Sequence, residues 1–338
     1  MKRCYFTLFT LLLITTLTLA DEGRKGQAGF QFLRIPMGAR QIAMGNSGLA
    51  SAIGAGAIYW NPAGVASQKG YEAQFSNVSW FGDVSYQHFT GVAGIGELGT
   101  IGFAVQYLSY PDIVETTEEA PDGTGATYAP YDLALVVNYS RQMTDKVAFG
   151  VNAKYVSETI ALVSASALAF DIGLTYNTGY QGLQLGFAIS NYGTKGQFTG
   201  SGLRRFVLRP DGPSNQTPVP VLFEADRIEL PSSVQMGLSI KPVKTENVSL
   251  LLNADQVVNT FSNDRTNLGV ELAYHDMIFV RGGYITRTDY NESTTGNANF
   301  GAGIKYEIAR NFTVLFDYAY ADLGLLDNAQ YITVGLQF

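Results

Sequence analysis

From Tyr71 to the C-terminal Phe338, apolar and polar residues alternate along segments of about ten residues. In the last segment Ile332, Val334 and Leu336 alternate with polar or small residues. Because successive side chains of a strand point to opposite faces, such segments are predicted to be strands with one apolar and one polar face. Strands are predicted over 71–80, 84–94, 99–108, 131–141, 147–158, 167–178, 183–192, 232–242, 248–258, 266–274, 277–287, 297–307, 311–321 and 329–338.

The connections between these segments alternate in length, with 81–83 as the exception. Every second connection is short: 95–98, 142–146, 179–182, 243–247, 275–276 and 308–310. The connections between them are longer: 109–130, 159–166, 193–231, 259–265, 288–296 and 322–328. Short turns at one end and long loops at the other are typical of outer-membrane barrels. The pattern predicts an all-β fold, a 14-stranded antiparallel transmembrane β-barrel over residues 71–338 with both termini in the periplasm.

Composition supports a membrane barrel over its alternative, a soluble sandwich. Only 15% of residues are charged, against roughly 25% in soluble domains, and 12% are aromatic. Tyr155, Tyr176 and Tyr306 fall near predicted strand ends, as the aromatic girdles of membrane barrels do. After the N-terminus no apolar run reaches the roughly 18 residues that a transmembrane helix requires.

Residues 1–20 are predicted to be a secretory signal peptide. Lys2 and Arg3 precede the apolar run 5–19, and Ala20 ends a small-residue cleavage site. The alternative is an uncleaved anchor helix. The single cysteine, Cys4, lies in this segment, so the mature chain is predicted to hold no disulfide and no thiolate. Export and a barrel together predict the bacterial outer membrane as the location.

Residues 21–70 are predicted to form a hatch inside the barrel. Almost every side chain from Leu49 to Gly56 is small, so this stretch cannot bury enough apolar surface to form its own core. Small residues do allow close packing against other backbone. Asn61 and Pro62 indicate a helix start, with Asn as the cap and Pro in the first helical position.

The hatch also carries a family resemblance. Phe32-Leu33 and Ile35 precede Gly38-Ala39-Arg40, Ala43-Met44-Gly45 and Tyr59-Trp60-Asn61-Pro62-Ala63-Gly64, and this pattern resembles the PorV/PorQ family. That family belongs to the wider FadL-like group of long-chain fatty-acid transporters. Homologues often carry acidic residues where this chain has 51–56, which are small or apolar. The motif residues are Gly38, Ala39, Arg40, Met44, Gly45, Trp60, Asn61, Pro62, Ala63 and Gly64.

The resemblance implies one of two functions. In PorV-like members the barrel serves type IX protein secretion, by receiving the C-terminal signal of secreted cargo proteins or by docking with a translocon subunit. In FadL-like transporters the hatch gates passive transport of hydrophobic small molecules across the outer membrane. The form of the motif favours the first function and leaves the second as the alternative. Either function places the barrel in contact with outer-membrane lipid.

Chemical motifs point away from an enzyme, and no cofactor or metal is predicted. Residues 94–99 match G-x-G-x-x-G, but a strand pattern resumes at Thr100, whereas a dinucleotide fingerprint must open a helix. His88 and His275 are far apart in the sequence. Acidic residues in loop 109–130 allow a divalent cation, although a solvated loop is favoured. The net charge of −7 argues against nucleic acid as a partner.

Charged and polar residues fall on the predicted inward faces. They form either a polar conduit or, as we favour, pairs with one another and with Arg34 and Arg40, because buried charges require partners. These residues are Asn152, Lys154, Asp171, Glu271, Arg281, Lys305 and Asp317.

Loop 193–231 is too long for a simple connection. It combines arginines, prolines and an apolar run, which suits a lid, a surface on which a partner peptide docks, or a flap packed on itself. The candidate partner-binding residues are Arg204, Arg205, Arg209, Val219, Val221, Leu222 and Phe223. For the transport alternative, Gly91, Gly94 and Gly96 are predicted to distort a strand and supply an exit.

Overall fold

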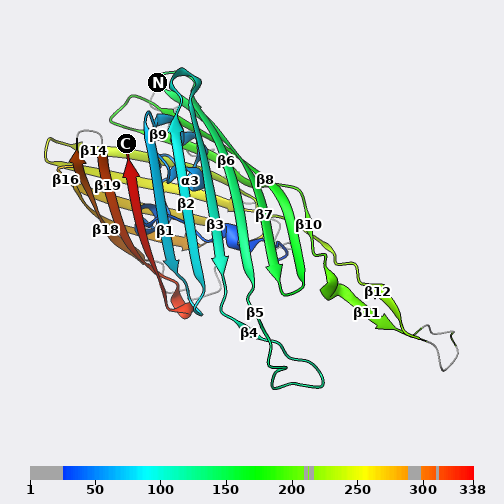
Figure 1. The fold of residues 1–338 in the computed structure, drawn as a ribbon. Helices are drawn as coiled ribbons and strands as arrows, with labels where there is room; N and C mark the ends of the chain where they lie inside the picture. Colours follow the sequence, from blue (N-terminus) through cyan, green and yellow to red (C-terminus); the bar gives the residue numbers. More distant parts are fainter. Residues whose placement is uncertain (1–25, 209–211, 213–216, 288–297, 310–311) are drawn as a thin grey trace.

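The computed structural model describes residues 26–208, 212, 217–287, 298–309 and 312–338. The predicted signal peptide therefore lies outside the described residues. Fourteen antiparallel strands close into one barrel, which confirms the predicted number (Figure 1). The strands are β1 (Tyr71–Ser79), β2 (Ser85–Gly94), β3 (Thr100–Ser109), β6 (Tyr131–Gln142), β7 (Val147–Ile160), β8 (Val163–Asn177), β9 (Gln184–Gly193), β14 (Ser233–Lys244), β15 (Val248–Asn259), β16 (Arg265–Tyr274), β17 (Ile278–Arg287), β18 (Ala298–Ala309), β19 (Phe312–Asp322) and β20 (Asn328–Gln337).

The barrel closes between its first and last strands. β1 pairs antiparallel with β20, from Glu72 opposite Gln337 to Ser79 opposite Gln330. Beyond this ladder the Phe338 amide donates to the Tyr71 carbonyl at 2.8 Å. Closure leaves neither strand with a free edge, which is the only way a sheet satisfies all of its backbone groups within the barrel.

Each strand buries one face and exposes the other. In β20, Tyr331 and Thr333 are buried, while Ile332 and Val334 are exposed. Large apolar side chains thus make up much of the outward face, unlike in a soluble sandwich, and the inward face carries polar and small residues together with the apolar residues of the core. None of the helices in the described part of the chain is long and apolar enough to cross a bilayer.

The N-terminal segment, residues 26–70, packs against the inward face of the wall. It contains four short helical turns: η2 (Gln31–Arg34), α2 (Ala39–Ala43), α3 (Ala57–Trp60) and η3 (Pro62–Ser67). The hydrophobic core lies between this segment and the strands. Buried members from the segment are Phe30, Phe32, Leu33, Met37, Ile42, Ile58, Trp60 and Val65, and those from the wall include Val78, Tyr86, Val92, Leu108, Val136, Val156 and Tyr331.

The long connections lie at one end of the barrel, as predicted, with one correction. Residues 159–166 are not a loop, because β7 and β8 pair as far as Ile160 and Val163 and leave only a tight turn. The stretch of Ser and Ala after Val163 alternates between exposed and buried positions. Such small residues give little hydrophobic contrast, so their strand pattern was not recognised in the sequence.

The two longest connections carry small ladders of their own. β4 (Ile113–Val114) pairs with β5 (Thr127–Tyr128). In the connection after β9, β10 (Gly196–Gln197) pairs with β13 (Arg227–Ile228). Further out, β11 (Arg204–Val207) pairs with β12 (Val219–Leu222), and this hairpin projects well beyond the barrel (Figure 1).

The glycine-rich strand predicted to be distorted is regular. β2 pairs residue by residue with β3, with Gly91 opposite Phe103 and no register shift. The Phe103 ring fills the space that a side chain at Gly91 would take, so the aromatic ring covers the glycine. Register shifts occur instead elsewhere, including one in β8 between Phe170 and Ile172 opposite β9.

Candidate functional site

Arg40 joins the N-terminal segment to a chain of buried charges. Its guanidinium donates to both carboxylate oxygens of Glu271 on β16, at 2.8 and 2.9 Å. Glu271 also accepts from Arg281 on β17 at 2.7 Å, and Arg281 donates to Asp317 on β19 at 2.6 Å. These contacts confirm the predicted pairing of the inward charges with Arg40. A bidentate arginine–carboxylate pair fixes orientation as well as charge, so this chain locks helix α2 against three strands.

The predicted pairing with opposite charges does not occur for Arg34 or Lys305 among the described residues. Arg34 donates instead to Gln31 at 3.1 Å and to Ser262 at 2.7 Å. Ser262 lies in the connection between β15 and β16, so Arg34 sits at the long-loop end of the barrel, away from the acidic residues on the strands. Within the described residues Lys305 takes part in no ion pair.

The Met44-Gly45 part of the motif lies directly on the wall. Gly45 has a left-handed φ of 67°. A Cβ added at Gly283 on β17 would overlap the backbone of Met44 and Gly45, and one at Gly269 on β16 would overlap Met44 and Ser47. The wall therefore requires glycine at these inward positions, because only glycine lets two backbones approach so closely.

The small-residue loop after Gly45 is held by one carboxylate that the sequence analysis did not single out. Asp255 on β15 accepts the backbone amides of Gly48 and Leu49 at 2.7 and 2.9 Å. The acceptor for these two amides therefore comes from the wall and not from the loop. An acidic residue on the inward face of a predicted strand was the available signal.

Asn61 and Pro62 connect both halves of the segment to the wall. The Asn61 side chain accepts from the Ala63 amide at 3.1 Å, which confirms its predicted capping role at the start of η3. Its Nδ2 donates to the Leu49 carbonyl at 2.9 Å and to the Leu174 carbonyl of β8 at 3.3 Å. The Pro62 carbonyl accepts from Ser140 on β6 at 2.6 Å.

Glycines on the inward face of the wall also leave room for Asn61 and Pro62. A Cβ at Gly173 on β8 would overlap Asn61, and one at Gly150 on β7 would overlap Pro62. Within the segment, a Cβ at Gly64 would overlap the Ala52 carbonyl. The strands therefore carry glycine on their inward face where the motif passes closest to the wall.

The remaining motif residues hold the segment together. Trp60 Nε1 donates to the Met37 carbonyl at 2.8 Å, which links the two halves of the motif. Gly38 precedes α2 with a φ of 87°, and the Ala39 amide donates to Thr333 on β20 at 2.9 Å. Some motif residues therefore contact the wall, whereas Gly38, Trp60 and Gly64 make their contacts within the segment.

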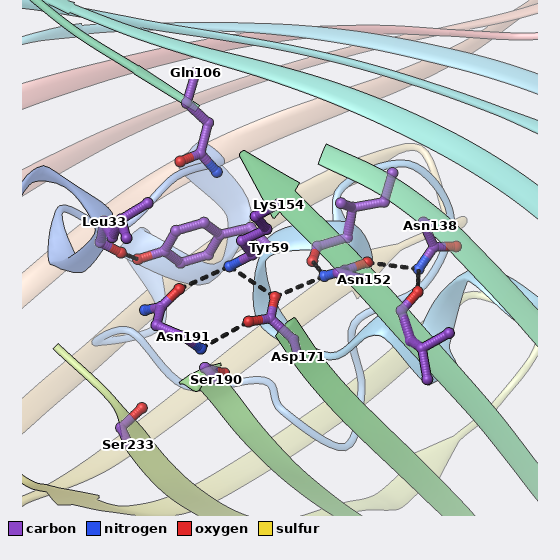
Figure 2. Close-up of polar contacts among 12 residues, drawn as sticks. Leu33, Tyr59, Gln106, Asn138, Asn152, Lys154, Asp171, Ser190, Asn191 and Ser233 are labelled. Carbon is purple, nitrogen blue, oxygen red and sulfur yellow. Dashed lines mark hydrogen bonds and ion pairs between the residues drawn. The ribbon is translucent and has the colours of Figure 1, made fainter. Parts of the chain in front are cut away.

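A second polar cluster lies beside Tyr59 and spans β6 to β9 (Figure 2). Lys154 on β7 forms a 2.7 Å ion pair with Asp171 on β8 and donates to Asn191 on β9 at 2.8 Å. Asp171 also accepts the Asn191 backbone amide at 2.8 Å, at the position where the β8–β9 register shifts. The wall irregularity is therefore closed by side chains.

The same cluster reaches the N-terminal segment. Asn152 on β7 donates to Asp171 at 2.8 Å and to the Ile58 carbonyl of helix α3 at 2.9 Å. Asn138 on β6 donates to Asn152 at 2.8 Å. The inward polar residues thus bond to one another and to the segment, as expected for buried polar groups, and the contacts favour pairing over an open conduit.

The predicted partner-binding residues come together on the β11–β12 hairpin. Arg204 lies opposite Leu222, and Arg205 lies opposite Val221. Phe206 and Leu222 expose 69% and 68% of their surface, and Phe223 is exposed as well. The Phe223 amide donates to the Leu203 carbonyl and closes the base of the hairpin, and the Gly202 amide donates to the Leu162 carbonyl of the β7–β8 turn, which ties this base to the barrel. Arg209 lies outside the described residues.

Metal ligands do not gather anywhere in the described part of the chain, where no three His, Cys, Asp or Glu residues lie close enough to hold an ion. In the predicted cation loop, Glu115 accepts instead from the Thr124 hydroxyl at 3.1 Å. The site consists of backbone-to-wall contacts and an exposed hairpin, an arrangement suited to holding and docking.

Comparison with known proteins gives a family and a fold. The sequence model described as type IX secretion system protein PorV matches residues 19–209. The structure is similar to the CymD monoaromatic hydrocarbon channel, with 15% identity, a TM-score of 0.56, and coverage of 90% of this chain and 97% of that chain. None of the curated proteins matches the sequence.

Two further solved structures share the fold. The Ralstonia pickettii toluene transporter TbuX is 14% identical with a TM-score of 0.52, covering 89% of this chain and 97% of that chain. A Pseudomonas aeruginosa FadL homologue is 12% identical with a TM-score of 0.52, covering 89% and 98%. At these identities the likeness concerns the fold alone.

Proposed function

This chain belongs to the family of type IX secretion system protein PorV, and we propose that it is an outer-membrane barrel that docks or shuttles proteins during their secretion. The observation that carries this proposal is the projecting β11–β12 hairpin, whose residues contact little of the barrel (Figure 1). The partner is a secreted cargo protein or a subunit of the translocon.

The hairpin offers both kinds of contact that a peptide-docking surface needs. Arg204 and Phe206 alternate along one strand, and Leu222 lies across from Arg204 on the other. Exposed aromatic and arginine side chains are the residue types enriched at binding hot spots. The outer edges of β11 and β12 pair with no other strand in the described part of the chain, so main-chain hydrogen bonds are also available.

The outward face of the barrel supports a location in the outer membrane, with lipid as a further partner. Exposed apolar side chains recur at alternate positions on neighbouring strands, for example Ile101 and Phe103 on β3 and Leu135 and Val137 on β6. In water such a continuous apolar surface would promote aggregation. In a bilayer it is the normal exterior of a barrel.

We assign the hatch role to residues 21–70 and the barrel to 71–338. The contacts of Arg40, Gly45 and Asn61 with the wall support a segment seated inside the barrel. Passive transport of hydrophobic small molecules remains the second candidate because the fold is shared with hydrocarbon channels. The segment and wall are closely packed in the described structure, which favours docking over transport.

Affinity purification of the tagged full-length chain from detergent extracts tests the proposal. We expect recovery of secreted proteins that share a C-terminal sorting domain, or of a large translocon subunit, both identified by mass spectrometry. Deleting 200–225 should abolish recovery, whereas deleting 115–125 in the other long loop should not. The docking function would be contradicted if no protein partner were recovered, if hydrophobic molecules were found bound, and if their uptake were lost on replacing Asn61 and Pro62.

A further inference from the structure

A small polar pocket lies between the N-terminal segment and the wall, at the long-loop end of the barrel. Its cavity is about 30 Å³, lined by Arg34 and Tyr59 from the segment and by Lys154, Ser190, Ser233 and Arg265 from the strands among others. A cavity needs roughly 10–15 Å³ to hold one water molecule, so this space accommodates a group of a few atoms. Figure 2 shows Tyr59, Lys154, Ser190 and Ser233 around this region.

The cations of this pocket are unequally paired. Lys154 is neutralised by Asp171. Arg34 bonds only to uncharged partners, Gln31 and Ser262, in the described part of the chain. The Nε of Arg265 is buried there without a hydrogen-bond partner. None of the described residues that line the pocket is acidic.

This arrangement is electrostatically unfavourable when the pocket holds only water. The charge of Arg34 acts unfavourably on Arg265, and Arg287 adds to the repulsion at both arginines. Burial, helped by Arg287, lowers the pKa of Arg34. Burial raises the pKa of Tyr59 to about 12, so its hydroxyl keeps its proton beside the two arginines. Both arginines are half-buried, and positive charges withdrawn from water in this way are stabilised by an anionic partner.

We propose that this pocket binds a small oxyanion, a carboxylate or a phosphate group, between Arg34 and Arg265. A guanidinium presents its N–H groups in a fixed fork that matches such oxygens. The hydroxyl groups of Ser190 and Ser233 already accept from Gln235, at 3.3 and 3.2 Å, and their hydrogens remain to be donated. The polar lining suits the anionic group itself and offers little surface to a hydrocarbon.

The bound anion has a structural consequence. Arg34 belongs to the N-terminal segment and Arg265 to strand β16, so an oxyanion between them ties the segment to the wall. Binding should therefore slow amide hydrogen exchange in residues 30–60, because a ligand that binds the packed state stabilises that state.

Calorimetric titration of the full-length protein in detergent with sodium phosphate or acetate, at constant ionic strength, tests the proposal. We expect saturable binding at one site, weakened on the order of tenfold or more in Arg34→Gln and Arg265→Gln, because each loses charge-assisted hydrogen bonds. The matched control is Arg141→Gln, an exposed arginine near the short-turn end of β6, which should bind like the unaltered chain.

Further arms separate the sources of the anion and exclude misfolding. Decanoate that binds far more tightly than acetate, with the same dependence on both arginines, identifies the anionic end of an amphiphile; similar affinities identify a free anion. Arg265→Gln removes one of two like charges, so its barrel should fold, and Arg265→Lys should keep part of the affinity. Absence of saturable binding, or binding unchanged in Arg34→Gln and Arg265→Gln, would overturn the proposal.

Discussion

Arg40 and Glu271 form a two-bond ion pair across the boundary between the N-terminal segment and strand β16, with nitrogen–oxygen distances of 2.8 and 2.9 Å. Their side chains are 24% and 8% exposed. Glu271 simultaneously accepts from Arg281. One carboxylate thus pairs with two arginines, one from each side of the boundary. Its loss would leave Arg40 without its counter-charge, whereas Arg281 would keep Asp317.

Glu271→Gln should destabilise the packed segment strongly. Removing one partner of a buried pair costs about 3–5 kcal/mol because it leaves uncompensated charge. Denaturant unfolding in detergent micelles, followed by the shift in heat-modified gel mobility, measures the change. The control is Glu307→Gln, at an exposed carboxylate on β18, which should leave the unfolding free energy almost unchanged. Equal stability of the two variants would mean that the pair contributes nothing to the fold.

Gly283→Ala should displace the segment while leaving the barrel assembled. Its added methyl would overlap the backbone of Met44 and Gly45. The neighbouring Gly282→Ala is a matched control in the same strand, because its methyl would meet only a Val270 side-chain carbon at 3.8 Å. Limited proteolysis with mass spectrometry should show cleavage within residues 38–66 for the first variant only. Identical cleavage patterns would contradict the close approach of segment and wall.

Deleting residues 38–66 should leave an assembled barrel. The strand ladder closes through β1 and β20 without any residue of the segment. Loss of the segment should open the lumen to small solutes, measured as entry of an otherwise excluded antibiotic or dye into cells. Failure of the deleted chain to reach the outer membrane would instead show that the segment is needed for folding.

The strands were predictable because each carries its own alternation. β20 is an example, since Ile332 and Val334 alternate with Tyr331 and Thr333 whatever the neighbouring strands contain. The β7–β8 turn was not predictable, because Ser and Ala after Val163 alternate without hydrophobic contrast. The small pairs within the longest loops were missed for a related reason, since two-residue strands carry no periodicity.

The contacts of the segment could be predicted in kind but not in detail. Inward charges were expected to form ion pairs. That Arg40 pairs with Glu271 depends on how the strands are staggered around the barrel, and no local sequence pattern encodes this stagger. The same holds for Asp255 and the amides of Gly48 and Leu49. Glycines at inward strand positions, such as Gly173 and Gly283, were visible in the sequence and mark where backbone approaches the wall.

Photo-crosslinking in living cells tests docking by the hairpin most directly. A photoreactive residue replaces Leu222, which is 68% exposed on β12, and the control position is Val334 on the outward face of β20. We predict adducts with secreted proteins that share a C-terminal sorting domain, or with a large translocon subunit, at position 222 and not at 334. No protein adduct at 222, in cells that are actively secreting, would contradict the proposed docking function.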